Sequence, residues 1–213
     1  SFVVDVGCGN GALTKVLCDK GYDVIGIDSN AQMLEKASSL YPDINFMLCD
    51  ATEFELSKKA DVIFSNAVFH WIDNQDKLVE NLADNLKNGG QLVFEFGGKG
   101  CAKTVHASLE KAFSDYGLTY HNDFNFKSIG EFAPILEKHG FRVEFATLFD
   151  RPTAQIGDNG LENWINMFCD KAFENVDKDT KNNIIKNAVE LCKPSLYKDG
   201  TWYVDYVRLR MKA

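Results

Sequence analysis

Residues 1–12 place the tightest constraint on how this chain can fold. A short apolar run leads into glycines at three alternate positions, Gly7, Gly9 and Gly11, and a helical pattern follows. Glycine lets the backbone turn sharply and approach a ligand closely, because it carries no Cβ. The helix behind such a turn offers unpaired N–H groups and the positive end of its dipole. This strand–loop–helix pattern is typical of the nucleotide-binding corner of a doubly wound α/β sheet.

The glycine pattern alone leaves the ligand open. Residues 7–12 fit the dinucleotide fingerprint G-x-G-x-x-G/A as well as they fit G-x-G-x-G. A tight strand–helix turn that binds nothing is a third interpretation. The remainder of the chain has to decide between them.

Composition bounds the class of protein. A chain of 213 residues is long enough for one α/β domain with an inserted cap and a sizeable core. Hydrophobic residues make up 45% and charged residues 25%, as in ordinary globular proteins. The net charge of −8 argues against a general nucleic-acid binder, which needs a basic surface against phosphate. We therefore expect no nucleic-acid partner.

The six cysteines are scattered, without a C-x-x-C pair or any zinc-ligand spacing, so we expect no metal site. Reduced thiols, no signal peptide and no apolar run long enough to span a bilayer predict a cytoplasmic protein without membrane association. The sequence lacks an initiator Met and starts directly on the first strand. We expect that an N-terminal segment is missing.

Strands alternate with helices over the first hundred or so residues. Apolar runs predict strands up to residue 6 and over 23–28, 44–50, 61–66 and 91–96, with helices over 12–20, from Ser29 to about 41 and over about 73–86. The first helix carries Leu13, Val16 and Leu17 on one face, and Ser29 with Gln32 predicts a capping box for the second. This alternation predicts right-handed βαβ units and a mostly parallel sheet.

The second half of the chain is predicted to be more helical. Helices are expected over 102–116 and from the Ser128–Glu131 capping box to Gly140, and strands over 141–149 and 201–211. We interpret the mostly helical residues 150–200 as a cap inserted between the last two strands, which would pair as an antiparallel hairpin. The chain is then a single domain over 1–213, with a cofactor-binding core over 1–149, the cap over 150–200 and the final strand over 201–213.

Polar side chains follow consecutive strands of this predicted sheet. In an open α/β sheet the ligand lies beyond the carboxyl ends of the strands. Asp28 is suited to accept hydrogen bonds from two ribose hydroxyls, Asp50 from an amine such as that of adenine, and Asp5 to face an ammonium group. Each one alone is usually a helix cap or a turn residue. Together with Asn66 after the fourth strand, they favour a ligand with an adenosine and a cationic tail over a pyrophosphate.

Five segments carry a resemblance to a known family: Asp5–Gly11, Asp28-Ser29 with Met33, Cys49–Ala51, Ser65–Trp71 and Leu86–Gly90. They resemble the successive motifs of class I S-adenosylmethionine (SAM)-dependent methyltransferases, and the terminal strand over 202–209 extends the likeness. The chain is most similar to the small-molecule type-11 group that includes trans-aconitate and malonyl-carrier-protein methyltransferases. The resemblance implies a Rossmann-like doubly wound seven-stranded sheet of order 3-2-1-4-5-7-6, with an antiparallel last strand and a helical cap inserted before it.

The resemblance also implies a cofactor site for SAM, with S-adenosylhomocysteine as the product. In that site the three glycines would line the methionine part of SAM, and Asp28, with Ser29 beside it, would hold the ribose. Contacts to the adenine and to the SAM amino group are implied for Met33, Asp50, the Ala51 N–H and the Asn66 backbone.

The acceptor is less well defined. Because the methyl group of a sulfonium is already activated, the protein mainly positions the nucleophile and excludes water. A carboxylate acceptor needs no base, whereas a hydroxyl or amine does. His70, followed by Trp71 as a pocket wall, is the best-placed residue for acceptor contact or general base, and a histidine packed between strand and helix is the alternative. In the cap, Trp164 and Phe168 are predicted to pack, and Arg151 is either a surface charge or a partner for an acceptor carboxylate.

The expected function is methyl transfer from SAM to a small-molecule acceptor, with a carboxylate oxygen favoured, by a monomer or weak dimer. Four alternatives stay open. They are a tRNA-modifying methyltransferase, a methyltransferase with a hydroxyl, amine or carbon acceptor, an NAD-dependent oxidoreductase, and a non-catalytic SAM-binding protein.

Overall fold

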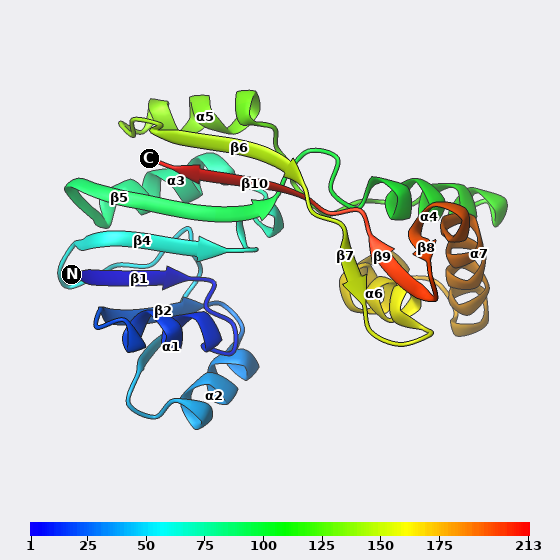
Figure 1. Cartoon of the computed structure of the whole chain (residues 1–213), viewed down its shortest axis with the longest axis horizontal. Coiled ribbons are helices and arrows are strands. Elements are labelled where there is room, and N and C mark those ends of the chain that lie inside the picture. Colours follow the sequence, from blue (N-terminus) through cyan, green and yellow to red (C-terminus); the bar gives the residue numbers. More distant parts are fainter. The chain divides into compact units, whose positions relative to one another are not determined.

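Seven strands form the main sheet in the computed structural model, which describes residues 1–213 (Figure 1). The order is β3-β2-β1-β4-β5-β10-β6, and the predicted order is therefore confirmed, with β10 in the place of the last strand. Neighbouring strands from β3 to β5 pair in parallel, whereas the β10 arrow runs against them (Figure 1). The strands are β1 (Phe2–Val6), β2 (Asp23–Asp28), β3 (Asn45–Leu48), β4 (Ala60–Asn66), β5 (Leu86–Gly97), β6 (Phe145–Asp150) and β10 (Val207–Lys212).

The chain divides into two compact units. The first comprises residues 1–98, 125–148 and 209–213, and the second comprises 99–124 and 149–208. The second unit thus includes the whole segment 150–200 that the sequence predicted as a cap, together with residues 99–124, 149 and 201–208. None of the helices combines the length and hydrophobicity that crossing a lipid bilayer requires.

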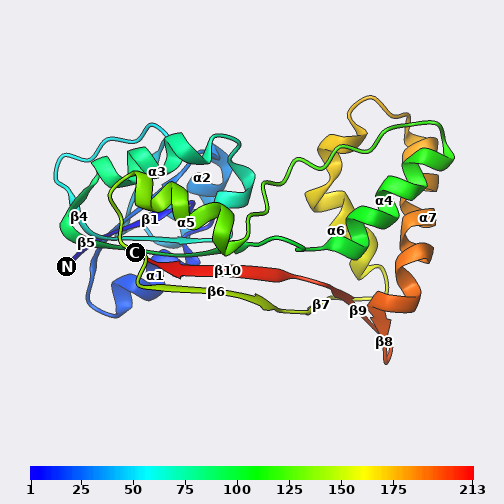
Figure 2. The same ribbon diagram turned by 90° about the horizontal axis from the view of Figure 1, so that it is seen from above.

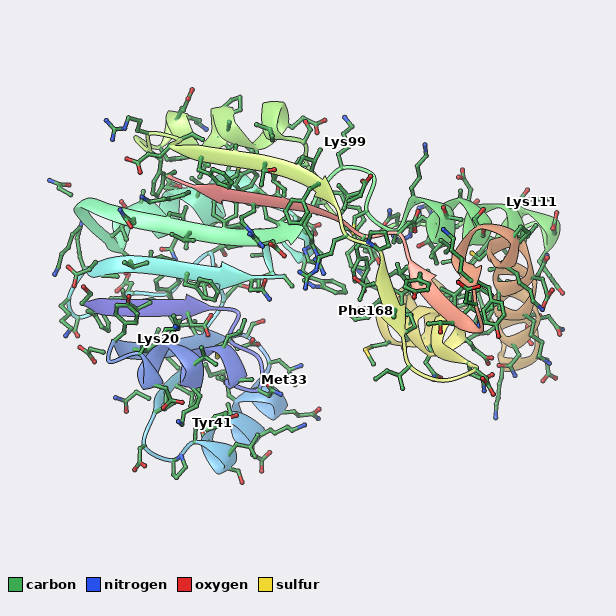
Figure 3. All side chains as sticks on the ribbon, viewed as in Figure 1. Lys20, Met33, Tyr41, Lys99, Lys111 and Phe168 are labelled. Carbon is green, nitrogen blue, oxygen red and sulfur yellow. The ribbon has the colours of Figure 1, made fainter.

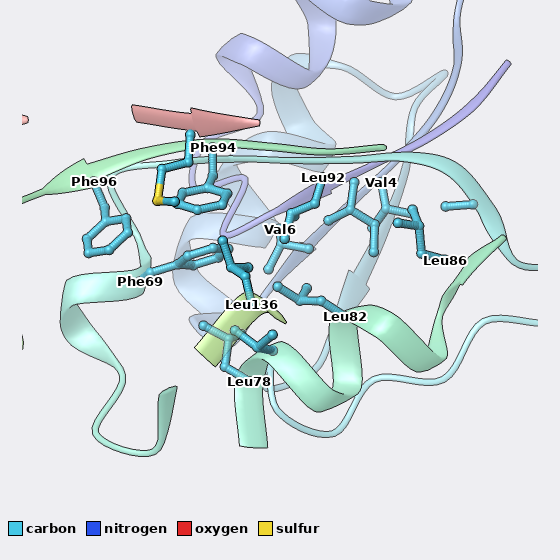
Figure 4. Close-up of a cluster of buried hydrophobic side chains, with 14 of the residues drawn as sticks. Val4, Val6, Phe69, Leu78, Leu82, Leu86, Leu92, Phe94, Phe96 and Leu136 are labelled. Atoms are coloured by element: carbon cyan, nitrogen blue, oxygen red, sulfur yellow. The ribbon is translucent and has the colours of Figure 1, made fainter. Parts of the chain in front are cut away.

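Helices cover both faces of the sheet in the first unit. Figure 2 shows α1 on one face and α3 and α5 on the opposite face. Aromatic and aliphatic side chains from β1, β4 and β5 meet those of α3 and α5 in a fully buried core (Figure 4). The helices of this unit are α1 (Ala12–Asp19), α2 (Ala31–Leu40), the 3₁₀ turn η1 (Phe69–Trp71), α3 (Gln75–Asp84) and α5 (Ile129–Lys138).

The second unit has a core of its own, in which Trp164 and Trp202 are buried. A small antiparallel sheet of order β7-β9-β8 packs with four helical segments. These elements are α4 (Lys103–Asp115), β7 (Thr153–Gln155), α6 (Gly160–Phe168), η2 (Asp170–Phe173), α7 (Lys178–Leu196), β8 (Tyr197–Lys198) and β9 (Thr201–Val204). The expectation of helices over 150–200 is met by α6 and α7, but β7 and β8 were not predicted.

The predicted single strand over 201–211 was wrong. The structure divides it into β9, which joins the small sheet, and β10, which joins the main sheet. The apolar positions change phase within this segment, from the even-numbered Trp202 and Val204 to the odd-numbered Leu209 and Met211. This change alone does not show that the two halves pair with different sheets.

The predicted cap of the second helix was also wrong. Asn30, rather than Ser29, is the N-cap of α2, and its side-chain oxygen accepts a hydrogen bond from Met33 N at 3.1 Å. Asp28 causes the shift, because its Oδ1 accepts from Asn30 N at 2.8 Å and so extends the turn by one residue. The Ser128–Glu131 capping box of α5 is confirmed.

The boundary between α3 and β5 differs from the prediction as well. The helix ends at Asp84 and the strand begins at Leu86, five residues before the predicted Gln91. The buried Asn85 side chain makes this early ending possible, since it accepts from Leu56 N at 2.9 Å and donates to Phe54 O at 3.0 Å. Such long-range bonds leave no trace in local periodicity.

The first helix exposes the apolar face that the sequence identified. Leu13 is 43% and Val16 is 47% exposed, and the buried side chain of α1 is the polar Thr14. A hydrogen bond from Thr14 to the buried Asp5 makes that burial tolerable.

The turn from β1 into α1 depends on glycine. Gly7, Gly9 and Gly11 have φ angles of 74°, 54° and 78°, a left-handed region that other residues avoid. A Cβ on Gly7 would lie 2.1 Å from a methyl carbon of Val68, and one on Gly11 would lie 2.8 Å from the Phe46 ring. A Cβ on Gly9 would have Met33 as its nearest neighbour, at 3.5 Å.

We predict that Gly7→Ala destabilises the protein far more than Gly21→Ala. Both residues have positive φ, but a Cβ on Gly21 would meet nothing within 4 Å. Gly21→Ala should therefore cost about 1–2 kcal/mol for the backbone alone, and Gly7→Ala about 3 kcal/mol or more, because overpacking is added. Urea unfolding curves of the two variants measure the difference. Equal losses would show that Val68 moves aside freely.

Candidate cofactor and acceptor site

The loop after β1 is fastened to the end of β2. Ile27 O accepts hydrogen bonds from Gly7 N at 2.7 Å and from Cys8 N at 3.0 Å. The next N–H, that of Gly9, points to the Asp28 side chain and donates to Oδ2 at 2.8 Å. The glycine loop and the predicted ribose carboxylate are therefore one hydrogen-bonded unit.

Asp28 is oriented by backbone donors on both of its oxygens. Oδ2 accepts from Gly9 N and Oδ1 accepts from Asn30 N, each at 2.8 Å. A carboxylate oxygen has two lone pairs, so each oxygen keeps a second acceptor position for a ligand hydroxyl. Ser29 lies between Asp28 and Asn30 in this turn and is exposed.

Met33 lies beside the open side of the loop. Its side chain is 38% exposed on the first turn of α2 (Figure 3), and its methyl group is the nearest atom to the position of a Cβ on Gly9. An apolar, partly exposed thioether next to a backbone without side chains is suited to pack against a flat ring.

The two other predicted polar residues, Asp50 and Asn66, lie just after β3 and at the end of β4. Asp50 Oδ1 accepts from both the N–H and the hydroxyl of Thr52, each at 2.7 Å, and Ala51 O accepts from Asn81 at 3.1 Å. Asn66 is exposed at the end of β4, and Ala67 after it has a φ of 62°. The Ala51 N–H thus lies in the turn after β3, and Asn66 is the last residue of β4.

Asp5 is a carboxylate deep in the first unit. It is 2% exposed, and its Oδ2 accepts a hydrogen bond from Thr14 Oγ1 at 2.6 Å. Burial raises the pKa of Asp5 to about 6, with a further contribution from the nearby Asp28 and a partly offsetting one from Thr14. Burial and Asp5 together raise the pKa of Cys8 to about 12, so that this thiol stays protonated. A cationic ligand group near Asp5 would offset the cost of the charge.

His70 and Trp71 form part of η1, directly after β4. His70 is 7% exposed, and its Nδ1 accepts a hydrogen bond from Gly97 N, at the end of β5, at 3.1 Å. Trp71 is exposed, with its ring centroid 5.4 Å from that of His70. His70 is therefore buried, as the packing alternative predicted. It follows β4 in the chain and is hydrogen-bonded to the last residue of β5, so it connects the carboxyl ends of these two strands.

The aromatic residues of the second unit pack against one another. Trp164 is buried and donates to the Tyr206 hydroxyl, and the ring of Phe168 lies 5.2 Å from that of Trp164. His106 Nδ1 is 2.7 Å from the Tyr120 hydroxyl, and burial lowers the pKa of His106 to about 4. Arg151 is exposed, and its backbone N–H donates to Tyr206 O.

Thr14 is the residue at this site that sequence reasoning missed. It lies on α1, nine residues after the carboxyl group that it contacts. The one available signal was a polar residue at a helix position that the fold has to bury. The structure contains no cluster of three or more His, Cys, Asp and Glu side chains arranged to hold a metal ion.

Both a family model and a full-length relative that match this chain are described as methyltransferases. Residues 4–94 match a family model described as a methyltransferase domain. Over 99% of its length the chain is 31% identical to an uncharacterized methyltransferase of Schizosaccharomyces pombe, and the match covers 85% of that protein.

Two further relatives match about half of the chain or less. Trans-aconitate 2-methyltransferase of Agrobacterium fabrum is 41% identical over 43% of this chain and 36% of its own length. Malonyl-[acyl-carrier protein] O-methyltransferase of Acetivibrio thermocellus is 37% identical over 52% of this chain and 40% of its own length. The match spans less than half of each of these two relatives.

Solved structures share the fold at low sequence identity. The YcgJ protein of Bacillus subtilis has a TM-score of 0.64 at 16% identity, over 99% of this chain and 90% of that one. Phosphoethanolamine N-methyltransferase 2 of Haemonchus contortus has a TM-score of 0.59 at 17% identity, over 100% of this chain and 48% of that one.

We predict that Asp5→Asn stabilises the protein at neutral pH and that the gain disappears in acid. Because folding raises the pKa from 3.8 to about 6, the folded state holds this proton more tightly, and the free energy of unfolding falls as pH rises through that window. The pKa difference corresponds to about 3 kcal/mol above pH 6.

Urea unfolding at a series of pH values measures this effect. The exposed Asp43→Asn serves as the control, since it removes a carboxyl group without changing a buried one. A stabilisation by Asp5→Asn that is the same at pH 4 and pH 7.5 would contradict the assignment of the cost to the buried charge.

Proposed function

The chain belongs to the class I SAM-dependent methyltransferases, and we propose that it transfers a methyl group from SAM to an oxygen of a small carboxylate acceptor. The observation that carries the proposal is the hydrogen bond from Gly9 N to Asp28, with Met33 beside Gly9 and the buried Asp5 in the strand before the loop. These groups fit an adenosine with a cationic tail.

The residues present suit the separate parts of the cofactor. Asp28 would hold the ribose through the acceptor positions that the loop leaves, and Met33 would pack on the adenine. Asp50 and the Ala51 N–H would bind the adenine edge. The glycine loop, the Asn66 backbone and the carboxylate of Asp5 would bind the methionine part, with Asp5 attracting the ammonium.

The buried carboxylate also argues against a dinucleotide. A pyrophosphate near the loop would be repelled by Asp5 and Asp28, whereas a sulfonium and an ammonium would be attracted. This difference in charge favours SAM over NAD at the same glycine loop.

When bound, SAM supplies a sulfonium methyl group, whose carbon bonds to an acceptor oxygen while the carbon–sulfur bond breaks and its electron pair stays on sulfur. A carboxylate acceptor becomes a neutral ester and releases no proton, whereas a hydroxyl or amine acceptor releases one. With a carboxylate acceptor, the protein needs to orient the acceptor and exclude water, and it does not need to supply a base. The trans-aconitate and malonyl relatives support a carboxylate, since both names denote acceptors that carry one.

Parallel calorimetric titrations with SAM, S-adenosylhomocysteine and NADH test the cofactor. Binding of the first two without the third is the expected result, and binding of NADH alone would overturn the proposal. Labelled methyl transfer to a series of small carboxylates, alcohols and amines then tests the acceptor. Measuring the pH in a weak buffer separates carboxylates from alcohols and amines. Methylation of a carboxylate should release no proton and leave the pH unchanged, whereas methylation of an alcohol or amine should lower it.

We predict that Asp28→Ala weakens S-adenosylhomocysteine binding by about 1–3 kcal/mol, the usual cost of losing hydrogen bonds to a charged group. An analogue without the two ribose hydroxyls should lose much less affinity on the same substitution. Calorimetry of both ligands with the wild-type and variant proteins gives the coupling free energy between the Asp28 carboxylate and the ribose hydroxyls. If the variant lowers the two affinities equally, Asp28 acts through the loop and does not bind the ribose.

A further inference from the structure

The packing around His70 fixes the position of its ring. Phe69, the preceding residue, is fully buried with its ring centroid 5.0 Å from that of Phe94. The His70 ring is nearly parallel to that of Phe96, at 16° and 6.3 Å, and lies 5.7 Å from that of Phe126. A ring packed on this many sides has one orientation.

The backbone around His70 is fixed as well. His70 O accepts a hydrogen bond from Asn125 N at 2.8 Å. The side-chain amide of Gln75 donates to Phe69 O at 2.9 Å and to Asn125 O at 3.2 Å. The 3₁₀ turn η1 and the segment at residue 125 therefore hold each other in place.

The hydrogen bond to Gly97 decides the chemistry of the ring. The Gly97 N–H is a donor, so Nδ1 of His70 must present its lone pair to it. A neutral imidazole carries one proton, which is then on Nε2. The folded protein thus holds His70 as the Nε2–H form, a hydrogen-bond donor at that atom.

A general base needs a nitrogen lone pair that can take a proton. In His70 that lone pair belongs to Nδ1, and a proton there would face the Gly97 N–H, donor against donor. Proton abstraction by His70 would require breaking a buried backbone hydrogen bond.

We propose that His70 is a fixed hydrogen-bond donor that binds and orients a carboxylate oxygen of the acceptor through Nε2–H, and that it is not a general base. The inference rests on the proposed function and assigns a binding residue to its carboxylate acceptor. A carboxylate oxygen accepts from Nε2–H and loses no proton on methylation, whereas a hydroxyl or amine acceptor would need the base that His70 does not supply.

Nitrogen NMR of the ligand-free protein tests the donor form without any activity. With labelled histidine, the expected spectrum has a protonated Nε2 and an unprotonated Nδ1 for His70 at pH 7.5, assigned by its loss in His70→Asn. Titration with malonate, as a small carboxylate probe, should shift the Nε2–H signal. A spectrum with the proton on Nδ1 would overturn the proposal, as would a His70 signal that malonate leaves unchanged.

Two substitutions separate the roles of the ring nitrogens. Asparagine places Oδ1 as far along the side chain as Nδ1 of histidine, so His70→Asn can keep the bond from Gly97 N but loses the donor. Glutamine places its amide nitrogen as far out as Nε2, so His70→Gln keeps the donor and loses the bond from Gly97 N.

We predict that His70→Asn lowers kcat/KM for the carboxylate acceptor about 10- to 100-fold, the factor for a lost hydrogen bond to a charged group. SAM affinity should not change. His70→Gln should lower the unfolding midpoint more than His70→Asn but keep more of the activity. Wild-type turnover by His70→Asn, or a His70→Gln that is stable and inactive, would overturn the proposal.

The two proposals fail in different ways. A wild-type protein that binds no SAM would remove the proposed function, but the nitrogen spectrum would still show which nitrogen carries the proton. SAM binding and carboxylate methylation with a proton on Nδ1 of His70 would leave the function in place and remove the role of His70.

Discussion

Val68 occupies the space that a side chain on Gly7 would fill, and the cofactor edge of the first unit depends on this contact. It brings the loop after β1 against the residues that follow β4. Val68 is also the N-cap residue of η1, which carries His70. The loop that would bind the cofactor and the turn that would meet the acceptor are therefore in van der Waals contact. A rigid connection of this kind preserves the relative position of two reacting groups.

The same region contains a buried charge that lowers the free energy of unfolding at neutral pH. Asp5 is buried with Thr14 as its hydrogen-bond donor, and Asp28 lies near enough to raise the pKa of Asp5 further. Two carboxylates close to a loop of backbone N–H groups disfavour an anionic ligand and favour a cationic one. The folded protein thus loses stability at neutral pH at a position where a positively charged ligand would recover it.

The arrangement of the sheet and much of the candidate site could be predicted from the sequence. Glycines at alternate positions, carboxylates after successive strands and the Ser128–Glu131 capping box are local signals, and each reflects a steric or hydrogen-bonding rule within a few residues. Features that involve distant residues were not predictable. Asn85 ends α3 through bonds to residues 54 and 56, and Thr14 is buried because Asp5 accepts its hydrogen bond.

The sequence by itself determined the fold class, the strand order by resemblance and the glycine loop, because backbone conformation and apolar periodicity are written into neighbouring residues. Only the tertiary structure decided which side of the loop is open, which nitrogen of His70 carries the proton and where the last strand divides. Met33 and Gly97 are distant in sequence from the loop and from His70, respectively. The last strand divides because β9 joins the small sheet and β10 joins the main sheet, and the partner strands of each lie elsewhere in the sequence. Packing and hydrogen bonds between remote segments select one outcome where local chemistry allows several.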